Sequence, residues 1–142
     1  MGLSFVAKVV FFLSAAIWAV CEAETIVVGG SEGWHYGYNY TNWAIDNSPF
    51  YMNDKLVFKY NPPRSAASAY TVYLLPNLLS YIRCDFSKSK KLANSNQGSG
   101  LGLTVELNQW RPYYFASNGG KGNSSHCKDG LMKFFAVPWP RI

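Results

Sequence analysis

The sequence has few of the features that would place it across a membrane or on a nucleic acid. Its longest apolar run, residues 9–20, is 12 residues long, short of the roughly 18 that argue for a membrane span. The C-terminal segment 137–142 has no apolar tail, so we expect no glycolipid anchor. The basic run 88–91 has only three lysines, too short a run to predict a nucleic-acid-binding protein.

The N-terminal segment is instead typical of a secretion signal. Lys8 supplies positive charge, the apolar run follows, and Cys21, Glu22 and Ala23 provide a cleavage site with small residues. Cleavage after Ala23 would leave residues 24–142, a length suited to one sandwich domain. We therefore expect a secreted, extracellular protein with a signal peptide at 1–23 and one domain at 24–142.

Cysteine is scarce, with three residues in the whole chain. Cys21 lies in the expected signal, so Cys84 and Cys127 remain. Two thiols in an oxidising compartment most simply form one disulfide. The bridge would close a loop of about 43 residues, for which the chain-entropy model gives about 4 kcal/mol.

Acidic residues are also few, and the net charge is +5. The expected signal has one Lys and one Glu, so its removal leaves this charge unchanged. A basic secreted domain favours weak attraction to acidic polysaccharide or to an anionic membrane over nucleic acid. A solvated charged face without a partner is the more common reason for such a charge. Aromatic residues make up 17% of the chain, and we expect most of them in the core.

Alternation of apolar and polar residues predicts strands. Leu101, Leu103, Val105 and Leu107 alternate with polar residues, as in a half-buried strand. Further strands are expected at 24–28, 56–60, 71–75, 110–116 and 131–137, separated by Gly-, Pro- and Asn-rich turns. This spacing indicates an antiparallel β-sandwich.

Only residues 77–83 have a helical pattern. Asn77 is the expected N-cap, and Leu78, Tyr81 and Ile82 are expected on one apolar face.

Several short motifs follow one another in a recognisable order. They are residues 28–34 with Asn42 and Trp43, then 53–60, 72–75, 81–85, 113–116, and a loop with His126, Cys127, Gly130, Lys133 and Phe134. Together they resemble the phytocyanins, the plant branch of the blue-copper proteins, and especially their early nodulin-like members. The resemblance implies an all-β, cupredoxin-like Greek-key sandwich of about seven or eight strands with one short helix. It also implies a disulfide between Cys84 and Cys127.

The copper-ligand positions implied by this resemblance are degenerate. A type 1 site uses two His, one Cys and a weak axial Met or Gln. These positions correspond here to Tyr70, Ser117, His126 and, for the axial ligand, Leu131 or Met132. A hydroxyl is a poor substitute for a copper thiolate, and the expected disulfide engages Cys127. We therefore expect no functional metal site and no cofactor.

These residues also allow three other interpretations. His126 could have no function, or it could pair with His35 in a new metal site. Ser117, His126 and Asp129 are the residue types of a hydrolase triad, but they lie close together without a nucleophile elbow.

The sequence also has two N-glycosylation motifs, at Asn39 and Asn123. The function that we expect is a non-catalytic binding or structural module in the apoplast. Its expected partners are cell-wall polysaccharide or cell-surface glycoproteins. The alternative is a copper-binding electron-transfer protein.

Overall fold

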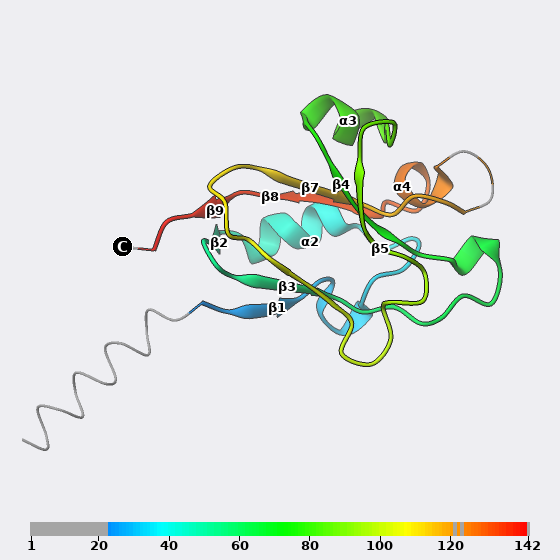
Figure 1. The fold of residues 1–142 in the computed structure, drawn as a ribbon, viewed down its shortest axis with the longest axis horizontal. Coiled ribbons are helices and arrows are strands. Elements are labelled where there is room, and N and C mark those ends of the chain that lie inside the picture. Colours follow the sequence, from blue (N-terminus) through cyan, green and yellow to red (C-terminus); the bar gives the residue numbers. More distant parts are fainter. Residues whose placement is uncertain (1–22, 121, 123, 142) are drawn as a thin grey trace, which may run out of the picture.

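Nine short strands form three sheets in the computed structural model, which describes residues 23–120, 122 and 124–141 (Figure 1). Residues 1–22 of the expected signal peptide and the expected glycosylation site Asn123 lie outside the described residues. One sheet has the order β1-β3-β6, a second has β5-β4-β7-β8, and a third pairs β2 with β9. Their bounds are β1 Thr25–Val27, β2 Phe50–Tyr51, β3 Lys55–Phe58, β4 Val72–Leu75, β5 Lys90–Ala93, β6 Leu103–Glu106, β7 Tyr113–Ala116, β8 Lys133–Ala136 and β9 Pro138–Trp139.

The helical segments are short. They are the α-helices α2 Tyr40–Asn47, α3 Leu78–Arg83 and α4 Ser125–Lys128, and the 3-10 helices η1 Gly30–Glu32 and η2 Ala66–Ser68. The mostly-β fold class is confirmed, whereas the expectation of one helix is wrong. No helix within the described part of the chain has the length and apolarity needed to cross a membrane.

An aromatic core joins the two larger sheets. Phe58 of β3 lies 5.3 Å from Phe115 of β7, and Phe115 lies 5.2 Å from Phe134 of β8, measured between ring centroids. Trp34 packs edge-on against Phe58 and donates a hydrogen bond from its indole nitrogen to the Thr71 carbonyl at 3.0 Å. The core thereby fixes the chain just before β4, next to the candidate site.

The strand pairing is mixed. Most neighbours are antiparallel, as expected, but β1 pairs with β3 and β2 pairs with β9 in parallel. Leu101, expected on the apolar face of a strand, precedes β6 and is 91% exposed. The strand begins two residues later, because Gly102 adopts a positive φ and its Cα lies against the Phe58 carbonyl.

The helix α2 was not predicted. The side chain of Asn39 caps it by accepting a hydrogen bond from the Asn42 amide, and Tyr40, Trp43 and Ala44 are buried. Its packing against β8 stabilises the helix. A short helix of this kind depends on tertiary contacts more than on local propensity, which explains why the sequence pattern did not reveal it.

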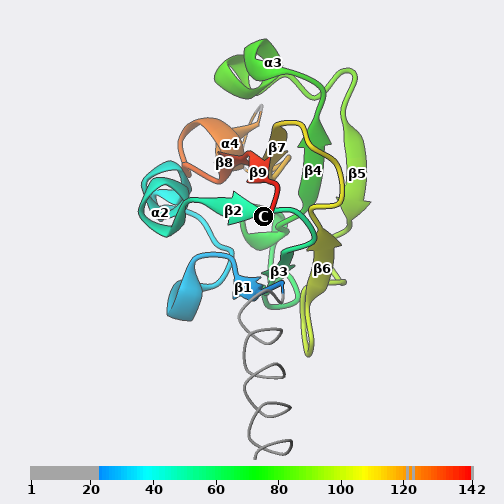
Figure 2. The same cartoon turned by 90° about the vertical axis from the view of Figure 1, so that its left-hand side faces the viewer.

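The helix α3 was predicted with its cap, since Asn77 accepts a hydrogen bond from the Ser80 amide. The apolar face was assigned wrongly. Tyr81 is buried, but Leu78 and Ile82 are 51% and 59% exposed. Of these three residues, only Tyr81 packs against the outer face of the four-stranded sheet. The helix itself stands out from the sheets (Figures 1 and 2).

Candidate functional site

The start of β4, the end of β7 and the start of β8 lie together at one end of the four-stranded sheet. Because β4 and β8 both run antiparallel to β7, the starts of β4 and β8 lie beside the end of β7. This arrangement brings together Thr71, just before β4, Ser117, just after β7, and Met132, just before β8. The helix α4 adds His126. The Met132 amide donates a hydrogen bond to the His126 carbonyl and so holds His126 at the same end of the sheet.

Ser117 and His126 form a buried hydrogen bond, with 3.1 Å between the serine Oγ and the imidazole Nδ1. The other nitrogen, Nε2, lies 2.8 Å from the Ala67 carbonyl oxygen, which can only accept. In the neutral ring Nε2 therefore carries the proton and Nδ1 accepts from the Ser117 hydroxyl. The Ser117 oxygen in turn accepts from the Thr71 amide at 3.0 Å, so the chain of hydrogen bonds is complete.

The environment favours the neutral imidazole. Burial lowers the pKa of His126 below its ordinary value, and the hydrogen bond to the Ala67 carbonyl opposes this effect. A protonated ring would also turn Nδ1 into a donor and reverse the Ser117–His126 bond. The surroundings of the pair therefore favour the neutral form of His126.

Aromatic rings and glycines enclose the imidazole. The ring centroid of Tyr70 lies 5.0 Å from that of His126, and the centroid of Tyr36 lies 6.5 Å from it. Gly120 approaches so closely that a Cβ there would stand 2.8 Å from the His126 Cδ2. His126 is thus fully buried.

Two cavities adjoin this cluster and share Tyr70. The smaller one, about 410 Å³, is lined by Tyr36, Ala67, Ser68, Tyr70, Ser125 and Asp129. The larger one, about 1020 Å³, has a mixed lining with aromatic rings and both signs of charge. Among its lining residues are Glu32, His35, Lys59, Arg64, Asn61 and Tyr70.

The two candidate axial positions differ in burial. Leu131 is 42% exposed and has a positive φ of 59°, whereas Met132 is fully buried and packs in the main core. The backbone of Met132 also accepts a hydrogen bond from the Ser117 amide at 3.0 Å. Of the two, Met132 is therefore the residue placed at the site.

Cys127 is bonded to Cys84, so the expected disulfide is confirmed. It joins the end of α3 to α4 next to His126 and uses the thiol that lies nearest in sequence to that imidazole.

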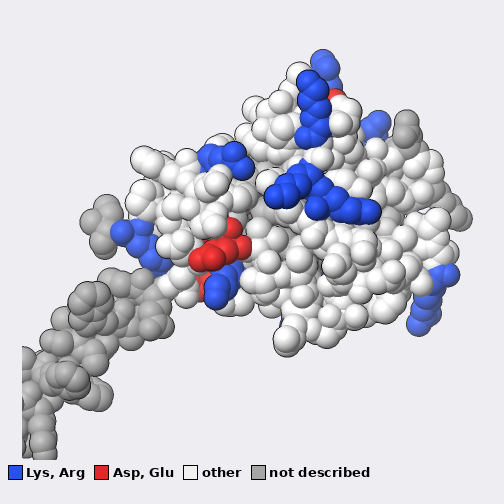
Figure 3. Space-filling view, viewed as in Figure 1, with Lys and Arg blue, Asp and Glu red and all other residues white. Residues whose placement is uncertain are grey.

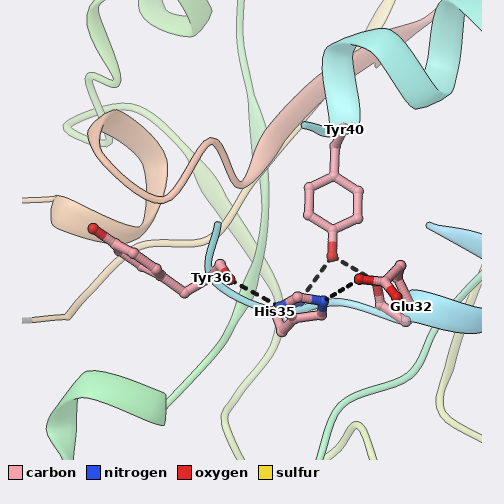
Figure 4. Close-up of polar contacts among 5 residues, drawn as sticks. Glu32, His35, Tyr36 and Tyr40 are labelled. Atoms are coloured by element: carbon pink, nitrogen blue, oxygen red, sulfur yellow. Dashed lines mark hydrogen bonds and ion pairs between the residues drawn. The ribbon is translucent and has the colours of Figure 1, made fainter. Parts of the chain in front are cut away.

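The other combinations are not assembled. The hydrolase triad would need His126 to bond Asp129, but its second nitrogen bonds the Ala67 carbonyl instead, and Asp129 is exposed. Both ring nitrogens of His35 contact other groups: Nδ1 lies 2.8 Å from the Tyr36 carbonyl oxygen, and Nε2 lies 3.2 Å from a carboxylate oxygen of Glu32 (Figure 4).

The residues at the ligand positions do not fit copper. The side chains at these positions are a phenol, a hydroxyl, one imidazole and the Met132 thioether, without a thiolate. The imidazole has no free lone pair, because Nδ1 accepts from Ser117 and Nε2 carries a proton. Within the described ranges, no three His, Cys, Asp or Glu side chains are grouped so as to hold a metal ion.

Comparison with known proteins places the chain in a family. A family profile described as a plastocyanin-like domain matches residues 34–131, which is more than half of the chain. The chain therefore belongs to the plastocyanin-like domain family. Proteins of this family are generally non-catalytic electron carriers. Among curated protein sequences, none matches this chain significantly.

Solved structures of plant blue copper proteins share the fold. Cucumber stellacyanin is 19% identical, with a TM-score of 0.64, and the match covers 84% of this chain and 97% of that one. Cucumber basic protein, a blue copper protein, is 23% identical, with a TM-score of 0.57 and coverage of 80% and 98%. Spinach plantacyanin is 19% identical, with a TM-score of 0.52 and the same coverage. These similarities establish the cupredoxin-like fold.

Sequence reasoning missed two participants in the site. Thr71 acts through its amide, and its hydroxyl exchanges two hydrogen bonds of 2.9 Å with the backbone of Asn118. Ala67 acts only through its carbonyl oxygen. Backbone groups carry no signal in the sequence, so only the folded arrangement reveals them.

Proposed function

We propose that this protein is a secreted phytocyanin of the early nodulin-like type that has lost its type 1 copper site. In this proposal, it acts as a non-catalytic binding or structural module in the cell wall or at the cell surface. The processed chain begins at Glu24 and is glycosylated at Asn39 and Asn123. Asn39 is exposed and uses its side-chain oxygen as the α2 cap, which leaves its amide nitrogen available for a glycan.

The observation that carries the proposal is the hydrogen-bond chain through Ser117 and His126. It engages both nitrogens of the one histidine at the ligand positions. A metal ion would have to displace the Ser117 hydroxyl from Nδ1, and beside that one imidazole nitrogen it would find a neutral hydroxyl oxygen, which is a poor copper ligand compared with a thiolate. The buried pair is stable without metal because each polar atom already has a partner.

A binding role is supported by the surface around the site. The cleft of about 1020 Å³ adjoins Tyr70 and offers Arg64, Asn61 and Glu32 as polar groups around an aromatic wall. Clefts of this size with convergent polar groups are common ligand sites. Cell-wall polysaccharide and cell-surface glycoprotein are the partners that the secretion signal and the net charge favour.

Copper-binding electron transfer is the second candidate, and family membership is what favours it. Metal analysis combined with a visible spectrum of the secreted protein separates the two. We expect a colourless protein without stoichiometric copper after exposure to Cu(II). The double variant Ser117→Cys/Tyr70→His should bind copper with intense visible absorption, because it restores a thiolate opposite Nδ1 and a second imidazole.

The matched control is Ser117→Ala/Tyr70→Phe, which alters the same positions without adding ligands and should stay colourless. Circular dichroism checks that each variant is folded. One tightly bound, redox-active copper in the unmodified protein would overturn the proposal. A folded double variant without copper would show that Tyr70 and Ser117 are not the former ligand positions.

A further inference from the structure

The helix α3 presents an apolar stripe to solvent. Leu78, Leu79 and Ile82 are 51%, 53% and 59% exposed. Their spacing of i, i+1 and i+4 places them side by side on the helix surface. Tyr81 points the other way and is buried in the cluster with Leu75 and Cys84. The helix stands out from the sheets, so the stripe lies on a protruding part of the molecule (Figures 1 and 2).

Cations border this stripe. A groove of about 520 Å³ runs from Leu78 to the neighbouring strands and is lined by Lys88, Lys90 and Arg111. Arg83 ends α3 itself. We call Leu78, Leu79, Ile82, Arg83, Lys88, Lys90 and Arg111 the α3 patch. Figure 3 shows Lys and Arg side chains spread over this upper part of the surface, with most of the acidic atoms of this face lower down.

The positive charge of the patch is largely uncompensated. Asp85, exposed, is the one acidic residue in the segment 78–91. The two ion pairs found among the described residues are His35–Glu32 and Arg141–Asp54, and neither uses a cation of the patch.

We propose that the α3 patch docks the protein onto a lipid bilayer whose surface carries anionic head groups. At such an interface, exposed aliphatic side chains enter the boundary of the acyl chains, while neighbouring Lys and Arg reach the phosphates. An acidic polysaccharide would match the cations but would leave the stripe in water. The bilayer is the partner that satisfies both halves of the patch at once.

The position of α3, which carries the stripe, is fixed by contacts at the C-terminal end of the helix. The Lys133 ammonium group donates to the carbonyls of Tyr81 and Ile82 at 2.9 and 3.3 Å, and the disulfide of Cys84 fixes the end of the helix. Such preorganisation reduces the ordering cost of binding. This inference goes beyond the proposed function. It does not depend on the loss of copper, because the hydrogen-bond and ring-contact partners of His126 are Ser117, Ala67, Tyr36 and Tyr70, none of which belongs to the patch.

Vesicle co-sedimentation of the secreted protein tests the proposal. We expect binding to phosphatidylcholine vesicles that contain phosphatidylserine, little binding to phosphatidylcholine alone, and weakening by salt. Lys88→Gln/Lys90→Gln/Arg111→Gln should reduce affinity about a hundredfold, since each surface cation contributes roughly a fivefold effect. Leu79→Ser/Ile82→Ser should reduce affinity at least tenfold, because the stripe can no longer bury its apolar surface.

Two matched controls separate the patch from general effects. Lys55→Gln/Lys59→Gln/Lys128→Gln removes the same charge elsewhere, and Ile45→Ser/Leu101→Ser removes exposed aliphatics elsewhere; both should bind nearly as the parent does. Tryptophan fluorescence of the Leu79→Trp variant should shift to the blue on vesicles. Equal losses in control and patch variants, an unshifted emission from the vesicle-bound Leu79→Trp variant, or capture by polygalacturonate without vesicle binding would each overturn the proposal.

Discussion

His126 is the residue on which the candidate site depends, because it is buried and both of its ring nitrogens have hydrogen-bond partners. In its neutral form, Nδ1 accepts a hydrogen bond from the Ser117 hydroxyl and Nε2 donates one to the Ala67 carbonyl. A buried imidazole with both nitrogens satisfied is a structural element in its own right. Its protonation should therefore affect folding.

We expect the stability of the protein to fall as the pH drops below about 6.5, the ordinary histidine value. The folded-state pKa of His126 is lowered, so the unfolded chain binds a proton first. The stabilising contribution is complete above about 6.5 and is lost between that value and the folded-state pKa, with a slope of at most about 1.4 kcal/mol per pH unit. Urea unfolding across this range measures it.

The matched variants are His126→Gln and His35→Gln. The first should flatten the pH dependence, since Gln keeps a donor for the Ala67 carbonyl but does not titrate. The second should leave it in place, because it does not alter the contacts of His126 with Ser117 and Ala67. An equal loss of slope in both variants would contradict the assignment to His126.

At the scale of the elements, α3 shows how a short helix is held by residues distant in sequence. Asn77 caps its start. The Lys133 ammonium group, from β8, lies 4.7 Å from the centroid of the Tyr81 ring and donates to two carbonyls at the end of the helix. The Tyr81 carbonyl also accepts a longer hydrogen bond, of 3.4 Å, from the Cys84 amide at the C-cap. Carbonyls in the last turn of a helix are not fully satisfied by the helix itself, so a cation there is stabilising.

Lys133→Met should lower the free energy of unfolding by about 1 kcal/mol, because it keeps the length of the side chain but removes a charged donor at a partly exposed position. Urea denaturation gives this value. Lys128→Met, on the exposed surface of α4, should change it by less than about 0.5 kcal/mol. Similar effects of the two substitutions would show that Lys133 does not support α3.

Prediction of the elements from the sequence succeeded where the signal is local. The cap at Asn77 and the alternation in β3 and β6 depend on neighbours along the chain, and the structure has these elements. The strand β5 begins inside the lysine run 88–91, where the sequence pattern predicted no strand. Its pairing with β4 provides the backbone hydrogen bonds, so it does not need an apolar sequence.

At the scale of the whole molecule, the disulfide ties two distant regions of the sandwich together. Cys84 and Cys127 are 43 residues apart, and their bond joins α3 to α4 across β5, β6 and β7 in the sequence. Closing a loop of this length restricts the unfolded chain considerably.

Cys84→Ser or Cys127→Ser should lower the stability by about 2–5 kcal/mol and reduce the amount of protein secreted. Unfolding of the purified variants and the yield in the medium measure the two effects. Peptide mapping without reduction should recover the 84–127 pair in the parent. Free thiols at both positions in secreted parent protein would contradict the assignment.

The sequence by itself determined the features that follow from residue identity and from local pattern. The mostly-β class, the Cys84–Cys127 pair and the hydroxyl groups of Tyr70 and Ser117 belong here, because strand alternation, thiol number and side-chain chemistry are properties of the residues themselves. Tertiary structure alone decided which groups meet. It buried His126 against a carbonyl of η2, formed α2 on β8, and turned Leu78 and Ile82 of α3 to the solvent. Such outcomes depend on contacts between segments far apart in the chain, which a local pattern does not encode.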